Sequence, residues 1–301
     1  MLSAAVEREA QRLVQPYLND VAWPTVYLGL ACIASFLGIS YLAIAGIIPL
    51  WLGLILNSFI LYADQTPLHE AVHGNIAGKH KNYMWLNHLI GFLCGAVLLH
   101  EYKMFRAMHT MHHRDTNNPE FDPDVWVFAK TPVGVFFKCL TIPLQYHYYF
   151  FKNIFLAEEY RKEVIHIVLV YLALYSIMIW GVVSGYHWEV LALWYIPYFF
   201  ASGLIIYFFG YLVHPKEQGE ERFKNTRIYF FKGRYAPVIN LLWFFQTFHL
   251  IHHLYPRIPF YKYPAVFRHL HPILQHAGSH ILEYGAEEPS LDDTQTASVR
   301  N

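Results

Sequence analysis

The sequence predicts an all-α integral membrane protein, in which four transmembrane helices form two hairpins beneath a helical cap on the cytoplasmic side. Three observations lead to this fold class. Of the 301 residues, 55% are hydrophobic and only 15% are charged, whereas soluble domains carry about 25% charged residues. Residues 21–63 contain no charged side chain, and residues 164–213 contain only Glu189. Long uncharged stretches of this kind are typical of membrane-spanning segments.

Each uncharged stretch is long enough for two crossings. A helix rises about 1.5 Å per residue, so about 20 residues cross a hydrocarbon core of about 30 Å. Residues 21–63 amount to about twice that length. We therefore expect spans at about 22–40 and 46–63, joined by a turn between Gly38 and Gly46. The second stretch predicts spans at about 164–182 and 190–213, joined by residues 184–189.

The basic residues give the orientation, because every Lys and Arg lies outside the two uncharged stretches. If both hairpins leave the membrane surface and return to it, all these residues lie on one side, and the positive-inside rule makes that side the cytoplasm. The cap then comprises residues 64–162 and 214–282, with both chain termini on its side. The sequence indicates one domain at 1–282, which begins with an amphipathic helix at the membrane surface within residues 1–20. Residues 283–301 are predicted to be a polar tail.

Residues 83–99 are also apolar, but the segment is short and contains Asn87 and His88. If it crossed the membrane, the histidines before and after it would lie on opposite faces. An interfacial or re-entrant helix keeps these histidines together, and we predict that arrangement.

Composition excludes some functions. Lys+Arg and Asp+Glu are equal at 22 each, so the basic surplus of a nucleic-acid-binding protein is missing. Cys32, Cys94 and Cys139 are scattered among apolar residues. Their spacing fits neither a disulfide framework nor a zinc or iron–sulfur site, and we expect reduced, buried thiols.

The 19 histidines include three clusters: HEAVH at 69–73, HTMHH at 109–113 and HLIHH at 249–253. Histidines at i and i+4 share a helix face, so both imidazoles of the first cluster can reach one metal ion. In the other two clusters we expect the histidines at i and i+3 to face together and the adjacent one to turn toward a neighbouring metal. Eight imidazoles packed without a metal would suffer desolvation and mutual repulsion. The clusters therefore predict a metal site, for which iron and zinc are both suitable.

Two alternatives stay open from the residues alone. The first cluster matches the HExxH pattern of zinc proteases, in which the glutamate, here Glu70, is the general base. That function needs one further ligand and leaves the other clusters without a purpose. A non-enzymatic metal-binding or transport protein is the second alternative, although transport sites lie near the membrane midplane rather than in a cap.

The three clusters, in this order and separated by two hydrophobic hairpins, resemble the histidine boxes of the membrane fatty acid desaturase superfamily, which includes carotenoid hydroxylases and ketolases. The resemblance covers about residues 22–275. It implies a cytosolic cap that holds two Fe ions, with O2 as co-substrate and a lipid entering from the bilayer. A further ligand often follows the last span, and His214 matches it. The implied metal ligands are His69, His73, His109, His112, His113, His214, His249, His252 and His253.

Residues near the boxes are candidates for orienting these ligands, because metal-bound histidines usually donate their other N–H to a carboxylate or carbonyl. The candidates are Asp115, Glu120, Asp122, Asp124 and Gln246. Residues 118–124 resemble a DPD-containing stretch of carotenoid hydroxylases and ketolases. Residues 246–263 also look closer to that branch than to many acyl desaturases.

The resemblance implies an oxidoreductase that attacks an otherwise inert C–H bond. A second hydrogen abstraction gives an alkene, whereas hydroxyl rebound gives an alcohol, and the outcome depends on sub-ångström placement of the substrate. We expect the substrate to be a fatty acyl chain. A ring of a β-carotene-type carotenoid is the alternative.

The chain lacks the motifs of a built-in reductant, because it has neither a G-x-G-x-x-G motif after a strand nor a cysteine set for an iron–sulfur cluster. We therefore expect electrons from a separate carrier, such as ferredoxin or cytochrome b5. Basic residues of the predicted cap suit either an acidic carrier or anionic lipid headgroups. They are Lys79, Lys81, Lys103, Arg106 and Arg114.

Overall fold

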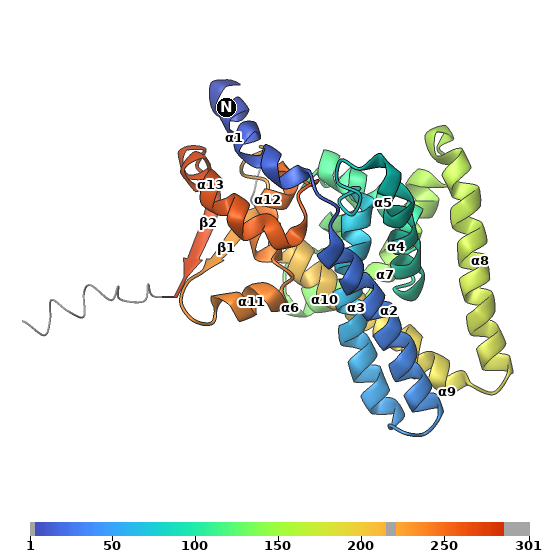
Figure 1. The fold of residues 1–301 in the computed structure, drawn as a ribbon. Helices are drawn as coiled ribbons and strands as arrows, with labels where there is room; N and C mark the ends of the chain where they lie inside the picture. The colour runs from blue at the N-terminus through green and yellow to red at the C-terminus, as the bar shows by residue number, and fades with distance from the viewer. Residues whose placement is uncertain (1–3, 215–220, 286–301) are drawn as a thin grey trace, which may run out of the picture.

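The structure, a computed structural model, describes residues 4–214 and 221–285. Helices dominate this part of the chain (Figure 1). Its buried apolar side chains form two cores. One core joins the long helices to the segments between them. The other joins the N-terminal helix to the C-terminal segments. The candidate site lies where the regions of the two cores meet.

The first hairpin consists of α2 (Trp23–Ile44) and α3 (Leu50–Val72). The turn between them falls at 45–49, later than predicted, and contains Gly46 with a φ of 71°. This left-handed conformation favours glycine. Helix α3 continues without a break beyond the predicted end of its span at residue 63. Its first half exposes apolar side chains such as Trp51 and Phe59, whereas its last residues are buried.

The segment between the two hairpins folds back on itself. After η2 (Lys81–Tyr83), helix α4 (Met84–Val97) bends by 98° into α5 (Tyr102–Arg114). Glu101 caps α5, because its carboxylate accepts a hydrogen bond of 2.7 Å from the Met104 N–H. Four short helices follow: η3 (Pro123–Val127), α6 (Pro132–Leu140), α7 (Ile142–Tyr149) and η4 (Phe150–Ile154).

The second hairpin begins with η5 (Glu158–Tyr160) and α8 (Arg161–Val183). Its returning arm joins α9 (His187–Val190), η6 (Leu191–Tyr195), α10 (Ile196–Ile205) and η7 (Ile206–Tyr211) end to end. The segments η6 and η7 are π-helical, a conformation that is frequent at functional sites.

Within the described ranges, three helices are long and apolar enough to cross a membrane: Trp23–Ile44, Glu158–Val183 and His187–Tyr211. The bent pair of α4 and α5 raises this to four if the two helices form one broken span. Helix α3 is not among them, because its C-terminal half carries polar residues such as Asp64 and Glu70. These helices fit a multi-pass membrane protein.

The C-terminal part contains a small parallel sheet, which contradicts the expectation of an all-α fold. Strand β1 (Arg227–Phe231) pairs with β2 (His280–Tyr284), with Arg227 opposite His280. Both strands are short and contain Ile and Tyr, residues that favour strands. Residues 283 and 284, predicted to be tail, belong to β2. Between the strands lie α11 (Ala236–Leu242), η8 (Gln246–Phe248), α12 (His249–Leu254), η9 (Phe260–Lys262) and α13 (Tyr263–His276).

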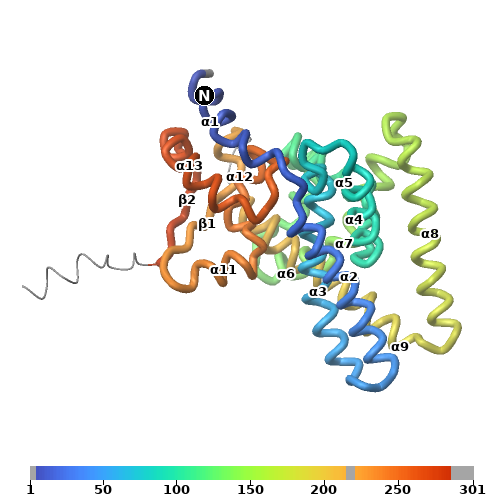
Figure 2. Tube along the Cα trace, in the orientation of Figure 1, coloured from blue at the N-terminus to red at the C-terminus, as the bar shows by residue number. Residues whose placement is uncertain are grey.

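The N-terminal helix α1 (Ala4–Val14) does form, followed by η1 (Gln15–Leu18). Helix α1 packs against α13 (Figure 2), and its Ala10 and Val14 are buried in the C-terminal core. Most of its other side chains are exposed. The rest of the predicted tail, residues 286–301, lies outside the described residues.

Candidate metal centre

The structure brings all nine predicted histidines together. His69 lies in the last turn of α3, and His73 caps the same helix. Three histidines come from α5 and three from α12. His214 follows directly after η7 and is 3% exposed. Four elements distant in the sequence therefore meet at one place.

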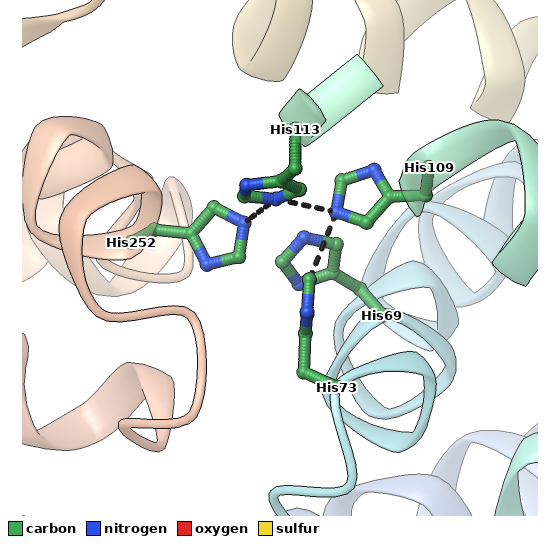
Figure 3. Close-up of side chains that lie close together, drawn as sticks. All are labelled: His69, His73, His109, His113 and His252. Atoms are coloured by element: carbon green, nitrogen blue, oxygen red, sulfur yellow. Dashed lines mark hydrogen bonds between the residues drawn. The ribbon is translucent and has the colours of Figure 1, made fainter. Parts of the chain in front are cut away.

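The histidines divide into two groups, in each of which the ligand nitrogens all lie within 4.8 Å of one another. The five-histidine group consists of His69, His73, His109, His113 and His252 (Figure 3). The four-histidine group consists of His112, His214, His249 and His253.

The grouping corrects one expectation from the sequence. In α5 and in α12, the histidines at i and i+4 share a group, and the histidine at i+3 joins the other one. In a helix with 3.6 residues per turn, positions i and i+4 are closer in direction than i and i+3. His109 and His113 therefore follow the same rule as His69 and His73.

The spacing of the ring nitrogens suits a bound metal ion. In the five-histidine group, the Nε2 atom of His113 lies 3.0 Å from that of His109 and 2.8 Å from that of His252. In the four-histidine group, the Nε2 atom of His249 lies 2.8 Å from that of His214 and 3.1 Å from that of His253. Imidazole nitrogens bound at about 2.0–2.1 Å to one metal, at right angles, lie about 3 Å apart.

The positions of the ring protons show why the site suits a cation. The Nδ1–H of His249 donates to the Oε1 atom of Gln246 at 2.8 Å. A neutral imidazole carries one N–H only, so the Nε2 atom of His249 presents a lone pair. That lone pair faces the Nε2 atoms of His214 and His253. A bound cation satisfies several converging lone pairs at once, so the donor set fits a metal.

Other side chains contact the Nδ1 atoms of the rings, on the side away from the converging Nε2 atoms. Asp122 accepts a hydrogen bond from the Nδ1–H of His112 at 2.9 Å, and Asp124 lies 3.5 Å from the same nitrogen. Gln246 binds His249 as described. These three predicted candidates are thus placed to orient ligands, in the way that carboxylates and carbonyls orient metal-bound histidines.

Two other candidates lie away from the rings. The Asp115 carboxylate pairs with the exposed guanidinium of Arg114 at 2.8 Å. Glu120 is exposed, and its backbone N–H donates to Asn118. Two contacts were not predicted: the Tyr263 hydroxyl lies 3.1 Å from Nδ1 of His252, and the Thr116 hydroxyl lies 3.4 Å from Nδ1 of His253. No motif signals either residue, because hydroxyl groups have many roles and Tyr263 comes from another helix.

Burial sets the charge of the rings. It lowers the pKa of His214, His249, His252 and His253 well below the ordinary value, and the neighbouring imidazoles lower it further. These rings are therefore neutral, as ligands must be. Burial also opposes the protonation of His112, but the carboxylates of Asp122 and Asp124 outweigh it and raise its pKa to about 9. A metal ion bound at Nε2 would take the place of the second proton on that ring.

These pKa directions predict how the metal-free protein responds to acid. Below about pH 6.5, these histidines bind protons in the unfolded protein but remain neutral in the folded protein, where they are buried. The free energy of unfolding therefore falls as the pH drops. His112 acts in the opposite sense: its contribution is complete below about pH 6.5 and is lost as the pH rises through about 9. The lowered groups outnumber it, because burial lowers the pKa of His69, His73, His109 and His113 as well. Thermal unfolding of chelator-treated protein should therefore occur at a lower temperature at pH 5.5 than at pH 7.5, and an unchanged melting temperature would contradict this.

A narrow cavity of about 40 Å³ reaches the two groups. Its polar wall includes His69, His112 and His249. Its apolar wall comes from α5, α7, α10 and η7, with the side chains of Phe105, Ile142, Ile205, Ile206 and Phe209. The π-helical turn of η7 thus contributes both to this wall and to the placement of His214.

Comparisons with known proteins agree with this architecture. The sequence profile of the family described as fatty acid desaturase matches residues 45–285. A fatty acid desaturase of Bacillus subtilis (strain 168) is 24% identical over 269 residues, which cover 79% of this chain and 71% of that protein. Fatty acid conjugase FAC2 A of Calendula officinalis is 24% identical, over 68% of this chain and 63% of its own length.

A shorter match has higher identity. An sn-1 oleoyl-lipid 12-desaturase of Synechocystis sp. (strain ATCC 27184 / PCC 6803 / Kazusa) is 30% identical over 132 residues, which cover 40% of this chain and 35% of that protein. The family match alone spans most of the chain and includes all three histidine clusters. The chain therefore belongs to the fatty acid desaturase family and is a desaturase-type oxidoreductase.

Proposed function

We propose that the chain is an O2-dependent, membrane-bound di-iron enzyme that introduces a double bond into a fatty acyl chain of a lipid. The observation that supports this most is the convergence of Nε2 lone pairs in two separate histidine groups. Imidazole ligands suit iron, and the family is an iron-using one. The names of the three relatives point to acyl lipids as substrates, whereas none of the three is a carotenoid enzyme.

The two histidine groups are the proposed binding sites of two Fe ions. Bound iron supplies the redox chemistry by which O2 is reduced and two hydrogens are removed from adjacent methylenes. Per double bond, one O2, two electrons and two protons are consumed and two waters form. Asp122 and Gln246 accept the outer N–H of His112 and His249, and the Tyr263 hydroxyl lies beside Nδ1 of His252. They fix which ring nitrogen points inward.

The apolar wall of the cavity positions the substrate. Ile205, Ile206 and Phe209 offer no hydrogen bonds, so they suit methylene groups and exclude water. The position of the chain against this wall decides between desaturation and hydroxylation, because both begin with the same hydrogen abstraction. A saturated acyl chain that has to enter so narrow a cavity displaces the surrounding apolar side chains.

The proposed membrane placement has four spans, with the metal centre and both termini on the cytoplasmic side. Helix α3 serves as the second span with its apolar first half, and its buried second half carries His69 out of the membrane into the cap. The 98° bend after α4 supports an interfacial helix, because the chain turns back before it could cross. The absence of Lys and Arg from residues 21–63 and 164–213 supports the orientation.

The zinc-protease alternative is less well supported. The Glu70 carboxylate is fully buried and accepts hydrogen bonds from Asn75 at 3.0 Å and from the Phe260 N–H at 3.2 Å. It therefore links α3 to the loop before α13 instead of facing a metal-bound water. A transport protein would also bind its metal near the midplane, whereas His69, His73 and His214 lie at or just after the ends of α3 and η7.

The electrons are proposed to come from a separate carrier of the ferredoxin or cytochrome b5 type. Three of the histidines, His73, His113 and His253, are partly exposed. The metal centre therefore comes close to the surface of the cap, where a carrier can approach it.

Expression of the chain in a host that makes both fatty acids and β-carotene tests the proposed function. With an active reductant present, mass spectrometry should show a new double bond in acyl chains and unchanged carotenoids, and the purified protein should contain about two irons per chain. An unchanged number of double bonds in the acyl chains would contradict the proposal. One zinc per chain, without iron, would favour the protease instead.

A further inference from the structure

A groove of about 710 Å³ lies between α5 and the beginning of α8. None of its lining residues belongs to either histidine group. His88 and Phe92 of α4 form one part of the wall, and α5 supplies Lys103 and Arg106. The remaining wall comes from η5 and α8, with Glu159, Tyr160, Glu163 and His166.

The groove carries charges of both signs that do not neutralise one another directly. Lys103 and Arg106 face it from α5, and Glu159 and Glu163 face it from the segment around residue 160. No ion pair joins any of these four side chains to the part of the protein between residues 4 and 214 or between 221 and 285. Because the cations and the carboxylates share one groove without pairing, there is room between them for a ligand that carries both charges.

The groove lies at the polar end of a membrane helix. Glu163 and His166 belong to the first turns of α8, whose apolar segment is long enough to cross a bilayer. Near the groove, α4 and α8 expose apolar side chains: Leu89 and Leu93 on α4, and Ile165 and Leu169 on α8. Figure 1 shows α8 at the outer edge of the bundle, with its upper end beside α5. A headgroup in the groove would thus have its acyl chains along apolar protein surface.

A second cavity continues the same arrangement farther along. It measures about 610 Å³ and is lined by Ala96 and Val97 of α4 and by Leu174 and Met178 of α8. His166 and Leu174 are eight positions apart, which corresponds to about 12 Å along a helix. This falls within about 15 Å, half of a hydrocarbon core. The polar groove at the first turns of α8 and the apolar cavity beyond it therefore follow one another along the helix, and the cavity extends as far as Tyr186 and Glu189 at its other end.

We propose that this groove binds the headgroup of a zwitterionic phospholipid that has an ammonium group, such as phosphatidylethanolamine. The phosphate lies between Lys103 and Arg106. The Lys103 ammonium group is a compact positive charge, and the planar Arg106 guanidinium can donate two parallel hydrogen bonds to phosphate oxygens. The ammonium group lies at Glu159 and Glu163, beside the ring of Tyr160.

The sequence left open whether Lys103 and Arg106 bind an acidic electron carrier or lipid. The structure favours lipid, because Glu159 and Glu163 in the same groove would repel an acidic protein surface. An ammonium-bearing headgroup, in contrast, uses both signs of charge. The inference depends on the membrane placement proposed above but not on the iron chemistry.

Lipid titration of the metal-free protein, followed by native mass spectrometry, tests the site. Phosphatidylethanolamine and phosphatidylglycerol with identical acyl chains are compared. Wild-type protein should prefer phosphatidylethanolamine. The double variant Lys103→Ala/Arg106→Ala should bind both lipids more weakly, by about tenfold or more, as expected when charge-assisted hydrogen bonds are lost. Glu159→Gln/Glu163→Gln should weaken phosphatidylethanolamine alone and so remove the preference.

Lys152→Ala/Arg268→Ala serves as the matched control, because both side chains are exposed and lie outside the groove. Its lipid affinities should equal those of wild type, and unchanged thermal unfolding of every variant shows that each is folded. Equal affinity of wild type for the two lipids would overturn the proposal. So would a Lys103→Ala/Arg106→Ala protein that keeps its lipid affinities but has a higher KM for a reduced acidic carrier. Lipid binding that persists in a protein without desaturase activity would refute the proposed function only.

Discussion

Replacing His249 by alanine is expected to abolish desaturation and to lower the iron content from about two ions per chain toward one. His249 contributes the Nε2 atom that lies nearest to His214 in the four-histidine group and also approaches His253. Its removal leaves three imidazoles and deprives Gln246 of its partner. Loss of a group that only orients a ligand typically costs 10- to 100-fold. Loss of the ligand itself should therefore lower activity by more than about 100-fold.

Iron analysis and acyl-lipid profiling of the same preparation measure this effect. His80→Ala is the matched control, because His80 is exposed and belongs to neither histidine group. The control should retain wild-type iron and activity. If the His249→Ala protein kept two irons and normal activity, the four-histidine group would not be a metal site.

The Asp122→Asn substitution is expected to lower activity and iron affinity by about 10- to 100-fold. Asp122 is buried, accepts a hydrogen bond from Nδ1 of His112 at 2.9 Å, and accepts others from the backbone N–H groups of Asn117 and Asp124. Asparagine keeps the shape of the side chain but removes the charge that favours a proton on Nδ1. The inward-facing nitrogen of His112 then becomes a poorer ligand.

Asp115→Asn provides the same chemical change outside the site, because Asp115 pairs with exposed Arg114. Titration with ferrous ion should show weaker binding for Asp122→Asn and wild-type binding for Asp115→Asn. Circular dichroism at each metal concentration separates a loss of affinity from a loss of fold. Equal affinities of the two variants would exclude a role of Asp122 in orienting His112.

The fold was predictable where it depends on long apolar stretches, and less so where polar residues are buried. The prediction ended the second helix at residue 63, because Asp64 interrupts the uncharged stretch. In the structure α3 continues, since Asp64 is turned into the protein and is not exposed at all. Charge in a sequence marks the end of contact with lipid more reliably than it marks the end of a helix.

The site was predictable as a set of residues but not as an arrangement. Histidines recur with helical spacing, so the clusters could be found in one sequence. His112 and His252 were expected with the wrong neighbours because i+3 was preferred to i+4, although helix geometry places i and i+4 closer in direction. Which helices supply each group depends on how α5 and α12 are rotated against each other, and no local spacing records that. Tyr263 was missed for a similar reason, because only the loop before α13 brings it to His252.

Each histidine group combines residues from several elements of the chain, and this has a consequence for biosynthesis. Both groups require α12, whose residues are made late, after both long hairpins. A nascent chain that has reached only α5 already presents His69, His73, His109 and His113, four of the five nitrogens of one group. Copper and zinc bind such sites more tightly than ferrous iron does. Loading with the proposed iron would therefore depend on keeping those metals scarce, or on withholding metal until synthesis has passed residue 253.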